Sequence, residues 1–294
     1  MRAGSRILPV IAIALALAGV SAAARAGEPL RIVAAENFYG DLAHQIGGAH
    51  VAVTSILSNP DDDPHLFETS ASTARALSGA EIVIYNGAGY DPWMDKLLSA
   101  SPAPDRVAIV AADLIGARSG DNPHLWYAPE TLPAIASKLA AELEKRDPAH
   151  AADYRANLAR FDAAFDEILK KVAAVKAEFA GTPVTATEPV FGYMAQAMGF
   201  DMLNEEFQLA TMNDTEPGPR QVADFEGSLK SGRVRILFYN SQVADDTTAR
   251  LLALAKASHV TVIGVTETEP GGKTIETWFG EQVAEVQQAL AGQK

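Results

Sequence analysis

The stretch YRANLARFDAAFDEILKKVAAVKAEF, residues 154–179, decides the fold of this 294-residue chain. Its apolar side chains recur at alternating intervals of four and three residues, the spacing of one face of an α-helix. Asp147 and Pro148 can begin this helix, and AGTP at 180–183 can end it. A helix of about 30 residues is roughly 45 Å long, enough to run along two lobes. A coiled-coil partner is the competing interpretation, but an isolated stripe within an α/β chain favours an internal spine. The apolar positions are Tyr154, Leu158, Phe161, Phe165, Ile168, Val172, Val175 and Phe179.

Strand-like and helix-like segments alternate on both sides of this helix. LRIVAAE, VAVTSIL, EIVIYNG and RVAIVAAD precede it, and PVTATE, VRILFYN and VTVIGVTE follow it. Such alternation indicates βαβ units and largely parallel sheets. The sequence therefore predicts an α/β fold of two lobes with mainly parallel sheets, linked by one long spine helix. The predicted parts are an N-terminal lobe at 27–146, the spine at 147–181 and a C-terminal lobe at 182–294. A stiff helical link should limit the lobes to small rocking movements around a ligand held between them.

Residues 1–26 are typical of a secretory signal peptide. Arg2 and Arg6 precede an apolar run, and Ala24-Arg25-Ala26 provides an Ala-x-Ala cleavage site. A membrane anchor is the competing interpretation, but the apolar run is short and Ala-rich. The chain contains no cysteine, so neither a disulfide nor a lipidated cysteine is expected. The sequence predicts a soluble periplasmic protein.

Acidic residues dominate the charge of the chain. It has 24 basic and 37 acidic residues, and three of the basic ones leave with the signal peptide. Nucleic acids and anionic membranes are poor partners for such a surface, whereas cations are good ones. Solubility alone is the simpler explanation. Nothing in the sequence indicates an oligomer, so a monomer is expected.

Two loops share one local design, in which an acid or amide and a proline precede a histidine, a leucine and a large aromatic residue. The first is DDDPHLF with His65, and the second is DNPHLW with His124. The proline stiffens each loop, and the apolar residues after the histidine can anchor it, so each loop can hold one imidazole. The aspartates at 61–63 can add hydrogen bonds, attract cations or form a solvated turn.

Two glutamates complete a candidate metal site. Glu188 ends PVTATE and Glu267 ends VTVIGVTE, so both lie where parallel strands end and ligands commonly bind. Two imidazoles and two carboxylates suit a divalent transition metal. Capping of the following helix competes for Glu188, and Glu269 could replace Glu267. The other four histidines show no such context and are interpreted as structural or surface residues: His44, His50, His150 and His259.

The mature chain resembles the zinc- and manganese-binding solute-binding proteins of bacterial ABC transporters, the TroA-like family. The resemblance rests on AAENFYGDLAHQIGG, on LSNPDDDPHLFETSASTARALSGAEIVIYNGAGYDPWMDKLL, on NPHLWYAPETLPAIASKLA, on TEPVFGYMAQAMGF and on RILFYN. It implies two lobes joined by one long helix, one metal ion between them, and delivery of that ion to an inner-membrane ABC permease. It also implies a binding protein rather than an enzyme.

Position by position, the resemblance implies four metal ligands, His65, His124, Glu188 and Glu267. The family usually has an aspartate where Glu267 stands, and many relatives have a glutamate where Asn240 stands. Two histidines with two glutamates form a harder site than three histidines with one aspartate. The chain also lacks the His-rich acidic loop of many zinc-binding members. Both points lean toward Mn(II) or Fe(II), although Zn(II) binds more tightly at most such sites.

Two other functions use the same residues. A secreted metal-dependent hydrolase would need an open coordination position and a base beside the metal-bound water. Four protein ligands tend to close a site, and the chain has neither His-Glu-x-x-His nor Gly-x-Ser-x-Gly. A binding protein for a metal chelate would need a roomier cleft with aromatic and arginine contacts. The two histidine loops and the acidic charge favour a bare cation.

Overall fold

A computed structural model of the chain describes residues 28–59, 67, 69–213, 215–243 and 246–292. The predicted ligand His65 and the three aspartates before it lie outside the described residues. Within this part of the chain, no helix is both long and apolar enough to cross a bilayer.

The N-terminal lobe is built on a four-stranded parallel sheet of order β2-β1-β3-β4. Strand β1 lies in the interior of the sheet, and its last five residues are all buried. A parallel sheet covered by helices requires such a continuous apolar run. The elements of this lobe are β1 (Leu30–Glu36), α1 (Asn37–Gly47), β2 (Val51–Leu57), α2 (Ala71–Ser78), β3 (Ile82–Tyr85), α3 (Pro92–Ala100), β4 (Val107–Val110), α4 (Ala111–Ile115) and α5 (Thr131–Arg146).

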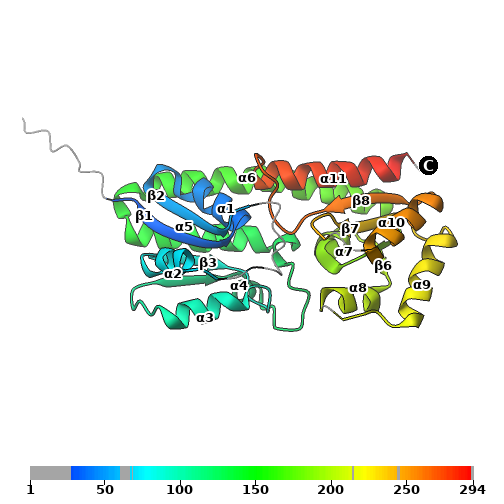
Figure 1. Ribbon diagram of the computed structural model, residues 1–294. Helices are drawn as coiled ribbons and strands as arrows, with labels where there is room; N and C mark the ends of the chain where they lie inside the picture. Colours follow the sequence, from blue (N-terminus) through cyan, green and yellow to red (C-terminus); the bar gives the residue numbers. More distant parts are fainter. Residues whose placement is uncertain (1–27, 60–66, 68, 214, 244–245, 293–294) are drawn as a thin grey trace, which may run out of the picture.

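The C-terminal lobe repeats the same topology in a second parallel sheet, of order β6-β5-β7-β8. Figure 1 shows the two sheets in separate lobes of an elongated molecule. The two-lobe α/β fold expected from the sequence is confirmed. The elements of this lobe are β5 (Pro183–Ala186), α7 (Gly192–Ala197), β6 (Asp201–Leu203), α8 (Glu205–Met212), α9 (Pro219–Lys230), β7 (Ile236–Asn240), α10 (Asp246–Ala257), β8 (Thr261–Val265) and α11 (Ile275–Ala291).

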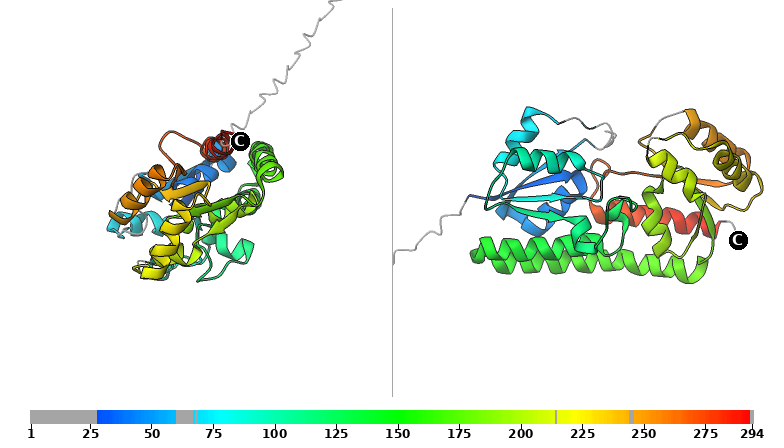
Figure 2. Two further views of the ribbon diagram at one scale, coloured as in Figure 1. Left: turned by 90° about the vertical axis from the view of Figure 1, so that its right-hand side faces the viewer. Right: turned by 90° about the horizontal axis from the view of Figure 1, so that it is seen from below.

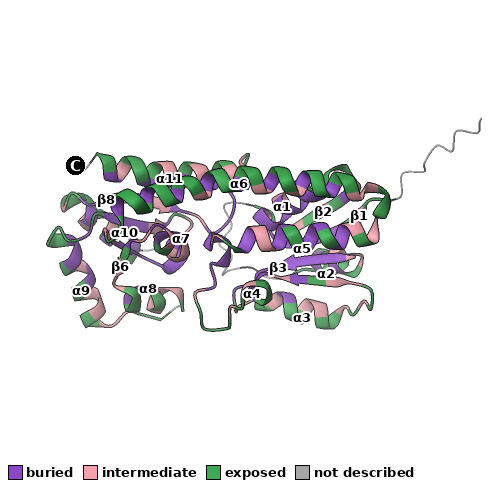
Figure 3. Ribbon diagram, turned by 180° about the vertical axis from the view of Figure 1, so that it is seen from behind, coloured by how far each residue is buried: buried purple, intermediate pink, exposed green. Residues whose placement is uncertain are grey.

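The long helix α6 (Ala151–Phe179) runs along both lobes, as the apolar stripe predicts (Figures 1 and 2). It packs against α5 and α1 of the N-terminal lobe and against α11 of the C-terminal lobe. Its outer face is exposed, like that of α11 (Figure 3). One stripe position differs from the expectation, because Leu158 is only partly buried while Asn157 is buried. Asn157 Nδ2 donates to the Ile46 carbonyl oxygen at 2.8 Å, which satisfies a carbonyl at the end of α1.

Aromatic side chains join the two lobes into one core. The rings of Phe38 in α1 and Trp278 in α11 lie 6.0 Å apart. Tyr127 contacts the rings of Phe191 at 5.2 Å and Phe279 at 5.1 Å. All five side chains are essentially buried. The lobes therefore share apolar contacts in addition to the helix that links them.

Three elements differ from the sequence-based expectation. Strand β6 was not predicted, because it has only three residues and none of them is fully buried. Helix α8 was also missed. It begins after Asn204, whose φ of 60° turns the chain sharply. The strand expected over RVAIVAAD ends at Val110, and the last residues of that run already form α4.

Candidate metal centre

The loops that follow the strands of both sheets meet between the lobes (Figure 1). In each sheet the strand that comes first in the sequence has a neighbour on both sides, β1 between β2 and β3, and β5 between β6 and β7. The order of the strands therefore reverses at β1 and at β5. Ligands commonly bind at such a switch point, beyond the carboxyl ends of the strands. The polar side chains there are Tyr90 after β3, His124 after β4, Glu188 after β5, Asn240 at the end of β7 and Glu267 after β8.

His124 is completely buried, and Asn122 fixes the orientation of its ring. Asn122 Nδ2 donates to the Pro189 carbonyl oxygen at 2.8 Å, so Asn122 Oδ1 faces the imidazole as an acceptor. This oxygen lies 2.6 Å from His124 Nδ1 and also accepts from the His124 backbone N–H at 3.1 Å. Nδ1 therefore carries the proton, and Nε2 presents its lone pair. Nε2 faces Glu267 Oε2 at 3.8 Å.

Glu188 and Glu267 are both buried and share one hydrogen-bond donor. Asn240 Nδ2 donates to Glu188 Oε2 at 3.1 Å and to Glu267 Oε1 at 2.6 Å. Asn240 Oδ1 accepts from the Gln242 backbone N–H at 3.1 Å, which holds the amide in this orientation. A single neutral amide thus holds two carboxylates in one buried place. Sequence reasoning had noted Asn240 only as a departure from the family pattern.

Tyr90 is a second donor to Glu267. Its hydroxyl lies 2.9 Å from Glu267 Oε2, the oxygen that faces His124. Burial, with Glu267 and Glu36 nearby, raises the pKa of Tyr90 well above its ordinary value, so the hydroxyl keeps its proton and donates. Tyr90 belongs to the N-terminal lobe and Glu267 to the C-terminal lobe. This hydrogen bond therefore crosses the interface between the lobes.

Two further contacts fix the loop that carries Glu267. Gln242 Oε1 accepts from the Glu267 backbone N–H at 2.6 Å. Asn37, at the start of α1, forms a reciprocal pair with Glu269, whose N–H donates to Asn37 Oδ1 at 3.0 Å and whose carbonyl accepts from Asn37 Nδ2 at 2.7 Å. The N-terminal lobe thus holds the loop directly beyond Glu267.

The carboxyl group of Glu269 lies in a different environment from that of Glu267. Burial first, and then the charges of Asp41 and Glu276, raise the pKa of Glu269 to about 8. Among the described contacts, Glu267 faces His124 and shares a donor with Glu188, and Glu269 does neither. This geometry favours Glu267 over Glu269 as the predicted ligand.

A buried pair of acids, Glu36 and Asp91, lies behind this cluster. Glu36 ends β1, and burial together with Asp91 raises its pKa well above the ordinary value. Asp91 accepts from the backbone N–H groups of Asn86 at 2.6 Å and Gly87 at 2.8 Å. Burial raises the pKa of Asp91 to about 6 despite these donors. Glu36 ends a strand in the same way as the two predicted glutamates, so its position was visible in the sequence.

The described cluster fits a metal ion. Two ligands at 2.0–2.2 Å from one ion at a tetrahedral angle lie about 3.4 Å apart, close to the 3.8 Å between His124 Nε2 and Glu267 Oε2. The structure brings together His124, Glu188 and Glu267, and His65 lies outside the described residues. Sequence reasoning missed Asn122 and Tyr90. An Asn two residues before His124 is typical of an Asx turn, which is a usable signal for Asn122.

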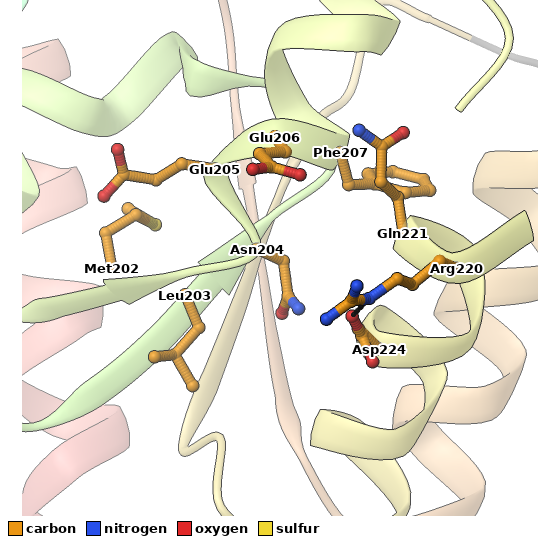
Figure 4. A pocket seen from close by; sticks show the side chains of 9 residues that line it. All are labelled: Met202, Leu203, Asn204, Glu205, Glu206, Phe207, Arg220, Gln221 and Asp224. Atoms are coloured by element: carbon orange, nitrogen blue, oxygen red, sulfur yellow. Dashed lines mark ion pairs between the residues drawn. The ribbon is translucent and has the colours of Figure 1, made fainter. Parts of the chain in front are cut away.

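Two hollows of the described surface are lined by none of these ligands. One of about 540 Å³ lies in the C-terminal lobe, between the β6–α8 segment and α9. Figure 4 shows that it carries charges of both signs, and Arg220 Nε pairs with Asp224 Oδ2 at 3.6 Å. Another, of about 550 Å³, is lined partly by Asn122 and Pro189. The described ligands of the candidate metal centre, His124, Glu188 and Glu267, are instead buried.

A family model described as "Zinc-uptake complex component A periplasmic" matches residues 32–289. The chain belongs to this family. It is therefore a solute-binding protein that captures a divalent metal ion for uptake by an ABC transporter, and the family is one of binding proteins rather than enzymes.

Relatives of known sequence and structure agree with this assignment. The chain is 28% identical to the manganese-binding lipoprotein MntA of Bacillus subtilis, over 83% of this chain and 82% of the relative. It is 24% identical to the iron-binding protein YfeA of Yersinia pestis, over 73% of this chain and 70% of the relative. Two solved structures share the fold, each with a TM-score of 0.73. The first is the periplasmic zinc-binding protein TroA of Treponema pallidum, which is 17% identical and covers 90% of this chain and 99% of its own. The second is FpvC of Pseudomonas aeruginosa in complex with Mn2+, which is 18% identical and covers 91% of this chain and 100% of its own.

Proposed function

We propose that the cargo is Mn(II) or Fe(II), held by His65, His124, Glu188 and Glu267. The observation that carries this proposal is the pair of buried carboxylates joined by Asn240, with His124 Nε2 facing one of them. Two carboxylates in one buried place need a compensating cation, because burying unpaired charge is costly. A bare divalent ion supplies that charge.

The donor set supports a hard ion. Carboxylate oxygens suit Mn(II), and imidazole nitrogen suits Fe(II) and Zn(II) alike. Zn(II) competes through its greater intrinsic affinity for such ligands, in the Irving–Williams order. Relatives described as manganese-binding and iron-binding support the proposed cargo. Glu188 and Glu267 are buried and accept hydrogen bonds from Asn240, and Glu267 also accepts one from Tyr90. This environment supports capture of an ion rather than hydrolysis at an open coordination position.

The proposed setting is the periplasm. Residues 1–26 would be removed as a signal peptide, and the mature chain would act as a soluble monomer beside its cognate inner-membrane permease. Relatives such as MntA are described as lipoproteins. This chain has no cysteine to carry a lipid, so we propose that it diffuses freely.

The test is thermal unfolding of the chelator-stripped mature protein with Mn(II), Fe(II) or Zn(II) added separately at graded concentrations. An ion that binds only the folded state stabilises it by about 2.7 kcal/mol at 100 times its dissociation constant. We expect stabilisation by all three ions, with loss of the Mn(II) and Fe(II) effects in His124→Ala. The concentration at which each ion acts ranks the three affinities.

Each outcome has a clear meaning. No stabilisation by any ion would refute the metal centre and would favour a metal chelate as the ligand. Stabilisation by Zn(II) alone would refute the proposed cargo but retain the centre. Equal stabilisation of the wild type and His124→Ala by Mn(II) or Fe(II) would show that this ion binds elsewhere in the chain.

A further inference from the structure

A second group of imidazoles and carboxylates lies at the start of α6. His50 ends a short 3₁₀ turn before β2, and Asp147 and His150 flank the turn that leads into α6. The two imidazole rings stack with centroids 3.8 Å apart and an angle of 17° between their planes. Sequence analysis had interpreted both histidines as isolated structural or surface residues. The fold brings them together from positions 100 residues apart in the chain.

Carboxylates bind both rings. His150 Nδ1 lies 2.6 Å from Asp147 Oδ2, and His50 Nε2 lies 3.0 Å from Asp153 Oδ2. The Tyr154 hydroxyl donates to Asp147 Oδ2 at 2.7 Å. Burial opposes ionisation of Asp147, but the hydrogen bonds from Tyr154 and His150 outweigh it and lower its pKa. Asp147 is therefore ionised at neutral pH.

The ligand atoms already lie near one another. One atom each from His50, Asp147 and His150 lies within 4.8 Å of the other two. Ligands of one tetrahedral ion lie about 3.4 Å apart, so the side chains need to close by little more than 1 Å. All three side chains are partly exposed, which leaves them room to rotate. The adjoining surface is also hollowed, along Gly48, Ala49, His50 and Asp153.

We propose that His50, Asp147 and His150 form a second metal site, of the imidazole–carboxylate type that Zn(II) prefers, with Asp153 supporting His50. Two neutral imidazoles and two carboxylates balance the charge of one divalent ion. The simple alternative is that Asp147 and its partners only cap the start of α6.

The second site is separate from the candidate metal centre. His50 directly precedes β2, whereas the ligands of the metal centre follow the carboxyl ends of the strands. The seven residues of β2 span about 23 Å at roughly 3.3 Å per residue. Ions at the two sites would therefore bind without contact, and this proposal does not depend on which ion is transported.

The test is the number of Zn(II) ions bound by the stripped mature chain, measured by equilibrium dialysis against buffered ZnCl2 with elemental analysis. We expect two ions for the wild type and for His44→Gln, a matched control at an exposed histidine of α1. We expect one ion for His50→Gln and for His150→Gln. Glu267→Gln, which damages the central site, should keep one ion, and in that variant Zn(II) should shift the ring ¹⁵N signals of His50 and His150.

The outcomes separate this site from the central one. Loss of one ion in both histidine variants, with ring signals that move in Glu267→Gln, supports the second site. A single ion in the wild type, or two ions in both histidine variants, overturns it. Ring signals that do not move while Glu267→Gln still binds Zn(II) also overturn it. Unfolding curves without metal check that each variant is folded.

Discussion

Asn122 controls which nitrogen of His124 can bind a metal, so replacing Asn122 tests the centre without removing a ligand. In the wild type, Asn122 Oδ1 accepts from His124 Nδ1 and leaves the Nε2 lone pair facing Glu267. Asn122→Ala removes this acceptor. Asn122→Asp keeps an acceptor oxygen at the same position. Both variants lose the bond from the side-chain amide to the Pro189 carbonyl, so their difference isolates the contact with the imidazole.

The magnitude follows from the two bonds. Loss of the hydrogen-bond partner of a metal-ligating histidine lowers metal affinity about 10–100-fold, which corresponds to about 1.4–2.7 kcal/mol. The neutral bond to Pro189 contributes about 0.5–1.5 kcal/mol to stability and is lost in both variants. We therefore expect Asn122→Ala to bind metal about 10–100-fold more weakly than the wild type. Asn122→Asp should stay within a few-fold of the wild type, because its charge also favours a cation.

The assay is competition with a chromophoric chelator, combined with ¹⁵N spectra of the imidazole rings in the stripped protein. The spectra should show His124 protonated at Nδ1 in the wild type and Asn122→Asp, and a mixture of tautomers in Asn122→Ala. Equal loss of affinity in both variants would refute the reasoning, since it would assign the effect to the bond with Pro189. A large loss in Asn122→Ala with an unchanged tautomer would refute it as well.

Five further variants test the neighbouring contacts. Glu188→Gln and Glu267→Gln should each abolish stabilisation by Mn(II) in thermal melts, while Glu269→Gln should retain it; the reverse result would make Glu269 the ligand. Glu36→Gln should flatten the pH dependence of stability in urea melts with chelator present. Glu36 has a pKa raised above its ordinary 4.5, so above pH 4.5 the folded wild type keeps a proton that the unfolded chain releases. The stability of the wild type therefore falls by up to about 1.4 kcal/mol per pH unit as the pH rises above 4.5. An unchanged slope in Glu36→Gln would contradict this. Asn37→Ala loses two hydrogen bonds to Glu269, so it should lose about 1–3 kcal/mol of stability. It should also release metal faster in stopped-flow chelation. An unchanged release rate would exclude a role for this contact in release.

The features that the sequence predicted well are those with a repeating physical signal. The stripe of α6 follows a period of 3.6 residues, and strands such as β1 are continuous apolar runs, so both could be identified from residue type alone. Strand β6 was missed because three residues, one exposed and two partly buried, are too few to show a period. Asn157 escaped because its burial depends on one carbonyl of α1, which no local pattern of α6 reveals.

Some residues of the candidate site could likewise be predicted from the sequence, and others could not. Potential ligands could be predicted because they are ionisable residues where parallel strands end. Their supporting donors could not, because neutral side chains such as Tyr90 and Asn240 acquire their roles only when the lobes meet. The pairing of His50 with His150 was hidden for the same reason, since it depends on how α6 docks on the N-terminal sheet.

We expect the ion to be released by local opening rather than by wide separation of the lobes. Separating the lobes would expose the aromatic contacts between α1 and α11 and those around Tyr127, all in one continuous core. Each buried aromatic side chain stabilises such a core by about 1.5–3 kcal/mol, so a wide hinge would cost several such contributions. The loop of Glu267 is held by hydrogen bonds from Tyr90, Gln242 and Asn240, by the bond from the Tyr127 hydroxyl to the Thr266 carbonyl, and by the pair of bonds between Asn37 and Glu269. These bonds can break at lower cost than the core, so we expect the ion to be freed by withdrawal of Glu267 on its own loop while α6 keeps the lobes in place.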